Sequence, residues 1–146
     1  MMQPTLVIGI GNTLRGDDGV GFRVAEQLVE SQPPHVYVIA THQLLPEHAD
    51  DIRHARQVIF VDAATTLPPG YVLQKPMQRC ANAQRSMHHM SPEQLLWMSH
   101  TLFDAAPAAW LITVGAEQFD TVEALSPAVE RALPEVAALL DEMFSA

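Results

Sequence analysis

A short apolar strand, a glycine-containing loop and an amphipathic helix follow one another within the first thirty residues. The run LVIGI (6–10) is rich in β-branched residues, as expected of a buried parallel strand. The segment VGFRVAEQLVE (20–30) has apolar residues at helical spacing. A strand that leads directly into a helix is the first half of a β-α-β unit, so this feature favours an α/β fold built on a parallel sheet.

The loop between this strand and this helix does not fit a nucleotide-binding motif. In GIGNTLRGDDGVG (9–21) the dinucleotide fingerprint would require a third glycine at the position of Leu14, and no Walker A lysine follows. The adjacent acids Asp17 and Asp18 would also repel a pyrophosphate at the start of the helix. A small nucleotide-binding domain is therefore a weak alternative.

The rest of the chain continues the alternation of strands and helices. We expect strands at HVYVIA (35–40), VIFVDA (58–63), YVLQKPM (71–77) and AWLITVGA (109–116), a short helix within LLPEHADDIRHARQ (44–57), a helix after Ser91, and a last helix in SPAVERALPEVAALLDEMF (126–144). Pro134 should bend or interrupt the last helix. This order predicts a single domain over residues 1–146 with a three-layer α/β/α sandwich and a mostly parallel five-stranded sheet.

Two local signals are unusually clear. The turn TTLPPG (65–70) is too short for a helical crossover, so the strand that follows should run antiparallel at a sheet edge, where Pro76 is tolerated. Ser91 is expected to be the N-cap of the next helix, with Pro92 in the first helical position and Gln94 completing a capping box.

Composition narrows the classes of partner. Eight basic and seventeen acidic residues among 146 give a net charge of −9, which argues against nucleic acid or an anionic membrane and would favour a cationic partner or a metal ion. The single cysteine, Cys80, excludes an internal disulfide and a cysteine-based zinc cluster. With no basic signal-peptide region and no apolar run long enough to span a bilayer, we expect a cytoplasmic protein.

Acidic side chains follow two of the expected parallel strands. Asp17 and Asp18 come after the first strand, and Asp62 ends VIFVD. Ligands of α/β sheets bind outside the carboxyl ends of parallel strands, although each acid could equally cap a turn or a helix. His88 and His89 precede the Ser91 cap, and one imidazole with two carboxylates would make a divalent-metal site. Without metal, the carboxylates could act as an acid–base pair, and the pattern alone leaves both possibilities open.

Four segments of the chain are distinctive when taken together: GIGNTLRGDDGVG, VIFVDA, SMHHMSPEQLL and the closing pair LITVGAEQF and LSPAVERALP. They resemble the hydrogenase maturation proteases, the endopeptidases that process the large subunit of nickel–iron hydrogenases. The first segment resembles the family's opening motif, in which a glycine–asparagine turn is followed by two acids and a glycine. The resemblance covers nearly the whole chain.

The resemblance implies a set of site residues. In the family, the second acid of the pair, the strand-end aspartate and the loop histidine surround a metal position, which correspond here to Asp18, Asp62 and His88. His88 is chosen over His89 because its spacing to the helix start fits the family pattern better. Asp17 is then left with a capping role.

The resemblance also implies an activity. A nickel-loaded large-subunit precursor would be cut near its C-terminus, and the nickel would be supplied by the substrate, with no permanent cofactor. Whether a metal or a carboxylate activates the water is left open, and a non-cleaving, nickel-sensing assembly or binding protein is the alternative. Many members carry a Gly-Thr pair after the second strand, where this chain has Thr41-His42-Gln43-Leu44. His42 could be an extra polar contact beside the cleft or an ordinary surface histidine.

Overall fold

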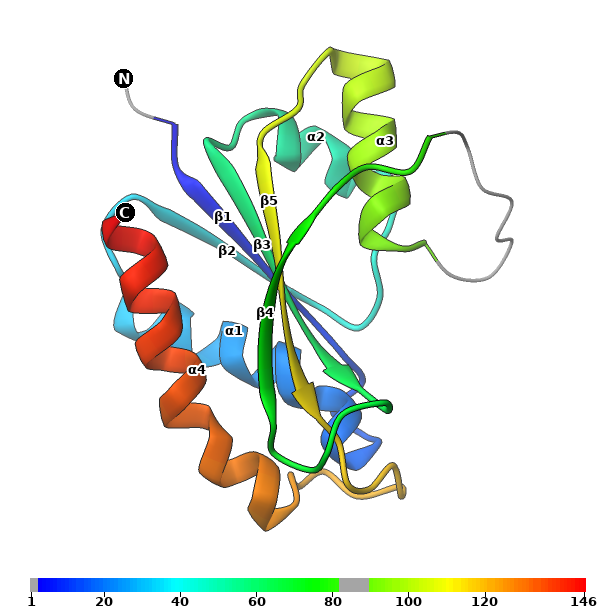
Figure 1. Ribbon diagram of the computed structural model, residues 1–146, viewed down its shortest axis with the longest axis vertical. Helices are drawn as coiled ribbons and strands as arrows, with labels where there is room; N and C mark the ends of the chain where they lie inside the picture. Colours follow the sequence, from blue (N-terminus) through cyan, green and yellow to red (C-terminus); the bar gives the residue numbers. More distant parts are fainter. Residues whose placement is uncertain (1–2, 82–89) are drawn as a thin grey trace.

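The computed structural model describes residues 3–81 and 90–146, which form five strands and four α-helices around one sheet (Figure 1). The elements are β1 (Thr5–Ile10), the 3₁₀ helix η1 (Gly16–Gly19), α1 (Val20–Ser31), β2 (Val36–Thr41), α2 (His48–Arg53), β3 (Gln57–Ala64), β4 (Val72–Met77), α3 (Pro92–Phe103), β5 (Ala108–Gly115) and α4 (Pro127–Ser145).

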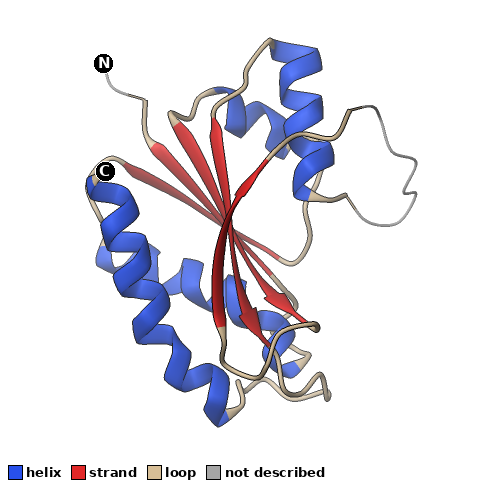
Figure 2. Cartoon of the chain, viewed as in Figure 1, coloured by secondary structure: helices blue, strands red, loops and turns tan. Residues whose placement is uncertain are grey.

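The sheet has the strand order β2-β1-β3-β5-β4. β2, β1, β3 and β5 are parallel, and β4 pairs with β5 in the antiparallel direction at one edge. Helices cover both faces of the sheet (Figure 2). The predicted α/β/α sandwich, its mostly parallel five-stranded sheet and its antiparallel edge strand are therefore confirmed.

Alternation along the central strands divides the core between the two faces. Val7 of β1 and Ile59 and Val61 of β3 point toward α1 and α4, with the apolar stripe of α4. Leu6 and Ile8 of β1 point to the opposite face, with the apolar residues of α2 and α3. Every residue of β1 is buried, because this strand lies inside the sheet with a helical layer on each face.

The second helix occupies only the middle of the predicted segment. We predicted a short helix within residues 44–57, and α2 spans only His48–Arg53. Leu44 is buried in the core although it precedes the helix. After the helix, the Arg56 N–H donates to the carbonyl of Pro4, so the chain has already turned toward β3. The pairing of β3 with β1 therefore sets the end of α2. The local sequence pattern gives no sign of this pairing.

The last helix runs without interruption through Pro134. Proline removes one backbone hydrogen bond and crowds the preceding turn, which led us to expect a bend or a break. The helix continues over Pro127–Ser145. Its apolar stripe is buried against the sheet on both sides of the proline: Val129, Leu133, Val136, Leu140 and Met143. This burial opposes an interruption of the helix.

The start of α3 is as predicted. The Gln94 N–H donates to Ser91 Oγ at 3.1 Å, and the Ser91 N–H donates to Gln94 Oε1 at 2.8 Å, which makes a complete capping box. In Figure 1, α3 lies with α2 in the upper part of the view, and it begins at its lower end. Within the described residues, no helix combines the length and the apolar character needed to cross a membrane.

Candidate active site

The loop after β1 folds back on itself and holds Asp18 beside the end of the sheet. A Cβ on Gly11 would lie 2.0 Å from the backbone oxygen of Asp18, so only glycine fits at this position. The Asn12 N–H donates to Asp18 Oδ2 at 2.9 Å, while Asn12 Oδ1 accepts from the Leu14 N–H at 2.9 Å. The glycine–asparagine turn of the opening motif therefore orients the Asp18 carboxylate.

Asp62 lies near the carboxyl end of β3, close enough to Asp18 for the two side chains to interact electrostatically. Its Oδ1 accepts a hydrogen bond from the Ala63 N–H at 2.8 Å. Burial is the main cause that raises the pKa of Asp62 to about 7, and the negative charge of Asp18 adds to it, against the opposing effect of the Ala63 bond. The structure thus brings together two carboxylates that are 44 positions apart in the sequence.

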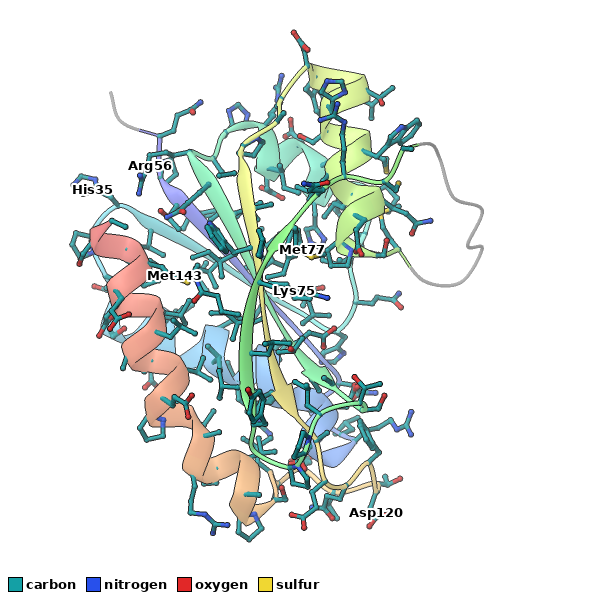
Figure 3. The ribbon with its side chains drawn as sticks, viewed as in Figure 1. His35, Arg56, Lys75, Met77, Asp120 and Met143 are labelled. Atoms are coloured by element: carbon teal, nitrogen blue, oxygen red, sulfur yellow. The ribbon has the colours of Figure 1, made fainter. Side chains whose placement is uncertain are left out.

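The pair lies at the end of the molecule where ligands of such sheets bind. Asp120, in the loop between β5 and α4, marks this end in Figure 3, whereas His35 and Arg56 mark the opposite end. Two carboxylates at a carboxyl edge can share a divalent cation, or one can exchange a proton while the other stays ionised. Both kinds of chemistry predicted from the sequence remain open to this pair.

The third predicted site residue, His88, lies outside the described residues, as does His89. Across residues 3–81 and 90–146, no three histidine, cysteine, aspartate or glutamate side chains are grouped so that they could hold a metal ion. Asp18 and Asp62 therefore need a further ligand, from the residues before Met90 or from a bound substrate, to complete a metal site. The role of His88 stays a prediction.

Asp17 is not a helix cap, and our prediction for it was wrong. Neither η1 nor α1 has a side-chain cap at its N-terminus. The Asp17 side chain is fully buried and accepts four hydrogen bonds from the loop between β5 and α4. The donors are the N–H groups of Glu117 (2.8 Å), Gln118 (3.1 Å) and Ser126 (2.7 Å) and the hydroxyl of Ser126 (2.8 Å).

These bonds decide the charge state of Asp17. Burial would raise the pKa of this carboxyl, but the hydrogen bonds from Ser126, Glu117 and Gln118 outweigh it and hold the pKa below its ordinary value. A buried, ionised Asp17 thus fixes the β5–α4 loop against η1. The Gly16 N–H bond to the Val122 carbonyl, at 2.8 Å, joins the same two segments. The contact between η1 and the β5–α4 loop joins residues about a hundred positions apart. A local sequence pattern carries no signal for such a contact, so it could not be predicted.

The segment after β2 borders the loop that carries Asp18, as the sequence indicated. The Thr41 carbonyl accepts from the Gly11 N–H at 3.0 Å. His42 is exposed, and its ring lies 5.2 Å from that of Phe22, near the start of α1. The segment that departs from the family pattern is therefore adjacent to the opening motif.

Comparison with known proteins relates this geometry to a family. No protein-family model matches the sequence, and neither does any curated protein. Solved structures match over almost the whole chain. A hydrogenase 2 maturation peptidase from a Thaumarchaeota archaeon is 26% identical, covering 96% of this chain and 97% of that chain, with a TM-score of 0.71.

Two further solved structures give the same result. The maturation protease HycI from Thermococcus kodakarensis is 23% identical, covering 99% of this chain and 94% of that chain, with a TM-score of 0.77. The hydrogenase maturating endopeptidase HybD from E. coli is 24% identical, covering 96% and 93%, with a TM-score of 0.69.

The chain has the fold of the hydrogenase maturation proteases. The resemblance that the four sequence segments indicate is thereby confirmed. Asp18 and Asp62 lie near each other at the carboxyl edge of this sheet, and their role as site residues stays a prediction.

Proposed function

We propose that this chain is an endopeptidase that removes the C-terminal extension of a nickel-loaded large-subunit precursor of a [NiFe] hydrogenase. The fold of the maturation proteases supports the assignment to this class. The observation that carries the proposal is the Asp62 carboxyl, whose pKa is raised to about 7 by burial and by the neighbouring Asp18. Such a pair is poorly explained by stability alone, because like charges in a partly buried site destabilise a fold.

The two carboxylates suit peptide hydrolysis. Cleavage needs a group that takes a proton from the attacking water and one that returns a proton to the leaving amine. A carboxyl with a pKa near 7 can do both at neutral pH, so Asp62 is the candidate for this exchange. Asp18 accepts a hydrogen bond from the Asn12 N–H, and its negative charge adds to the effect of burial, which is the main cause of the raised pKa of Asp62.

Nickel belongs to the substrate in this proposal. Nickel(II) accepts imidazole and carboxylate ligands, so the oxygen donors of Asp18 and Asp62 fit it, with His88 proposed as the nitrogen donor. The ion would supply recognition of a loaded precursor and, in addition, Lewis-acid activation. The proposal includes no permanent cofactor. Either the nickel ion of the substrate or the Asp62 carboxylate would activate the water that attacks the peptide bond.

The proposal is tested with purified precursor prepared with and without nickel. The protein should shorten the nickel-loaded precursor at its C-terminus and leave the nickel-free form intact. Binding of loaded precursor with no change in its length would instead indicate a nickel-sensing assembly protein. Processing is proposed to take place in the cytoplasm, in keeping with the single cysteine of the chain.

A further inference from the structure

The two edges of the sheet differ in their protection against an additional strand. Natural proteins protect an edge strand with charged residues or proline. β4 carries Lys75 and Pro76, both exposed, and Lys75 is labelled on this strand in Figure 3. β2, at the other edge, reads VYVIAT and has no charged residue, proline or glycine. The β2 edge is therefore open to a further strand, and the β4 edge is not.

The backbone of β2 shows which residues present this edge. The Thr5 N–H donates to the His35 carbonyl and the Gly11 N–H to the Thr41 carbonyl, so the odd-numbered residues of this segment bond to β1. In an extended strand, alternate residues direct their N–H and C=O groups to opposite sides. The N–H and C=O groups of Val36, Val38 and Ala40 consequently point away from the sheet.

No described residue satisfies these groups. Throughout residues 3–81 and 90–146, the backbone groups on the outer side of β2 have no protein hydrogen-bond partner. On this strand Tyr37 is 54% exposed. An edge of unpaired groups on a strand of β-branched and aromatic residues is the geometry of peptide recognition by strand addition.

The open edge leads to the candidate active site. β2 ends at Thr41, whose carbonyl is bonded to the Gly11 N–H at 3.0 Å. Gly11 in turn opens the loop in which Asn12 holds the Asp18 carboxylate. A peptide lying along β2 would therefore pass from the amino end of the sheet to the end where Asp18 and Asp62 lie.

We propose that the outer edge of β2 binds the extended polypeptide segment that adjoins the cleavage point of the precursor, as an added β-strand. The inference rests on the proposed endopeptidase function and names where its substrate docks. Backbone bonds to Val36, Val38 and Ala40 hold the segment irrespective of its sequence. This mode suits a substrate that must present an unfolded C-terminal stretch to a cleft.

The decisive variant is Val38→Pro. Proline removes the outward N–H and places its ring where a docking strand would lie, while the bonds of β2 to β1 come from other residues. With nickel-loaded precursor, we expect KM to rise about tenfold or more and kcat to stay near the wild-type value. Val38→Ala keeps the N–H and should leave KM within about twofold of wild type.

A matched control tests the other edge. Gln74 precedes Pro76 by two residues, so its N–H lies on the same side of β4, away from β5. Gln74→Pro should leave KM unchanged. Equal rises in KM for Val38→Pro and Gln74→Pro would show a general loss of structure and overturn the inference.

Hydrogen exchange makes the test independent of folding defects in a variant. When nickel-loaded precursor is added in excess to the wild-type protein, the amides of Val36, Val38 and Ala40 should exchange at least tenfold more slowly until the precursor has been cleaved. Cleavage by the wild type with no protection of these amides would refute the β2 site and leave the proposed function standing. Protection of these amides without cleavage would refute the function and support the β2 site.

A second copy of the chain is the competing occupant of the edge. In sedimentation experiments without precursor, the wild-type protein and Val38→Pro should have the same mass. A dimer that Val38→Pro dissociates would show that the edge serves self-association, and the docking proposal would be wrong.

Discussion

Asp17 and Ser126 lie 109 positions apart in the chain, and both the N–H and the hydroxyl of Ser126 donate to the Asp17 carboxylate, at 2.7 and 2.8 Å. Ser126 is also the N-cap of α4, where its hydroxyl accepts from the Val129 N–H. One buried carboxylate therefore links the loop after β1 to the start of the last helix. The neighbouring Asp18 instead accepts from the Asn12 N–H and interacts with Asp62, so the two adjacent acids have different surroundings.

Replacing Asp17 with asparagine should destabilise the protein by about 2–4 kcal/mol, because an amide cannot accept all four bonds and would present its own NH₂ to a donor. Thermal or denaturant unfolding measures the loss. Ser126→Ala keeps the backbone bond and should cost about 1 kcal/mol. An Asp17→Asn variant as stable as the wild type would show that these bonds are not what holds the loop.

The same carboxylate makes the fold sensitive to acid. The folded pKa of Asp17 lies below its ordinary value of 3.8, so its stabilisation is complete above that value and is lost as pH falls through the folded pKa. Asp17→Asn should remove part of the acid-induced fall in melting temperature. A fall of the same size in the variant would assign acid sensitivity to other groups.

Asp62 has the opposite pH dependence. Its folded pKa of about 7 lies above the ordinary value of 3.8, so its contribution to stability is complete below about pH 4 and is lost as pH rises toward 7. Asp62→Asn should therefore stabilise the metal-free protein by about 1–3 kcal/mol at pH 8 and by little at pH 4. Melting temperatures at the two pH values measure the difference.

A divalent ion should reduce this difference. Nickel added at pH 8 neutralises the repulsion between Asp18 and Asp62 in the wild type and has no comparable effect on Asp62→Asn. A variant that melts below the wild type at pH 8 without metal would show that Asp62 has an ordinary structural role.

Processing should depend on the three predicted site residues and not on the neighbouring histidine. Asp18→Asn, Asp62→Asn and His88→Ala should each lower cleavage of nickel-loaded precursor by at least about 100-fold, as expected for groups that act on the reacting atoms. His89→Ala is the matched control and should cleave normally. Loss of cleavage in His89→Ala with normal cleavage in His88→Ala would show that His89, and not His88, is the site histidine.

Gly11→Ala should damage both the site and the fold. The added methyl group would meet the Asp18 backbone oxygen at 2.0 Å, so the loop must shift and Asp18 with it. We expect a loss of about 2–4 kcal/mol and of processing. Leu14→Ala is a suitable control in the same loop, because Leu14 is 50% exposed, and it should change neither property. Normal cleavage by Gly11→Ala would show that the Asp18 position is not critical.

The fold was largely predictable because its signals are local. The apolar runs of the strands, the short turn before β4 and the Ser91–Gln94 capping box each lie within a few residues, and each appears in the structure. The proximity of Asp18 and Asp62 was predictable for a topological reason. Parallel strands end at the same edge of a sheet, so acids that follow two neighbouring strands meet there.

What could not be predicted depends on contacts between distant segments. Asp17 beside a helix start has the pattern of a cap, and only the packing of the β5–α4 loop on η1 gives its carboxylate other donors. The boundary of α2 is set by the pairing of β3 with β1, and the continuity of α4 through Pro134 by burial on the sheet. None of these determinants lies within a local sequence window.

The central claim is that the Asp18–Asp62 pair cleaves a nickel-loaded precursor, and intact-mass spectrometry of that precursor tests it most directly. After incubation with the wild-type protein, the precursor should lose the mass of a C-terminal peptide, and the released peptide should appear. The Asp62→Asn protein, folded and at equal concentration, should leave the mass unchanged. An unchanged mass with the wild type, or equal cleavage by both proteins, would contradict the account.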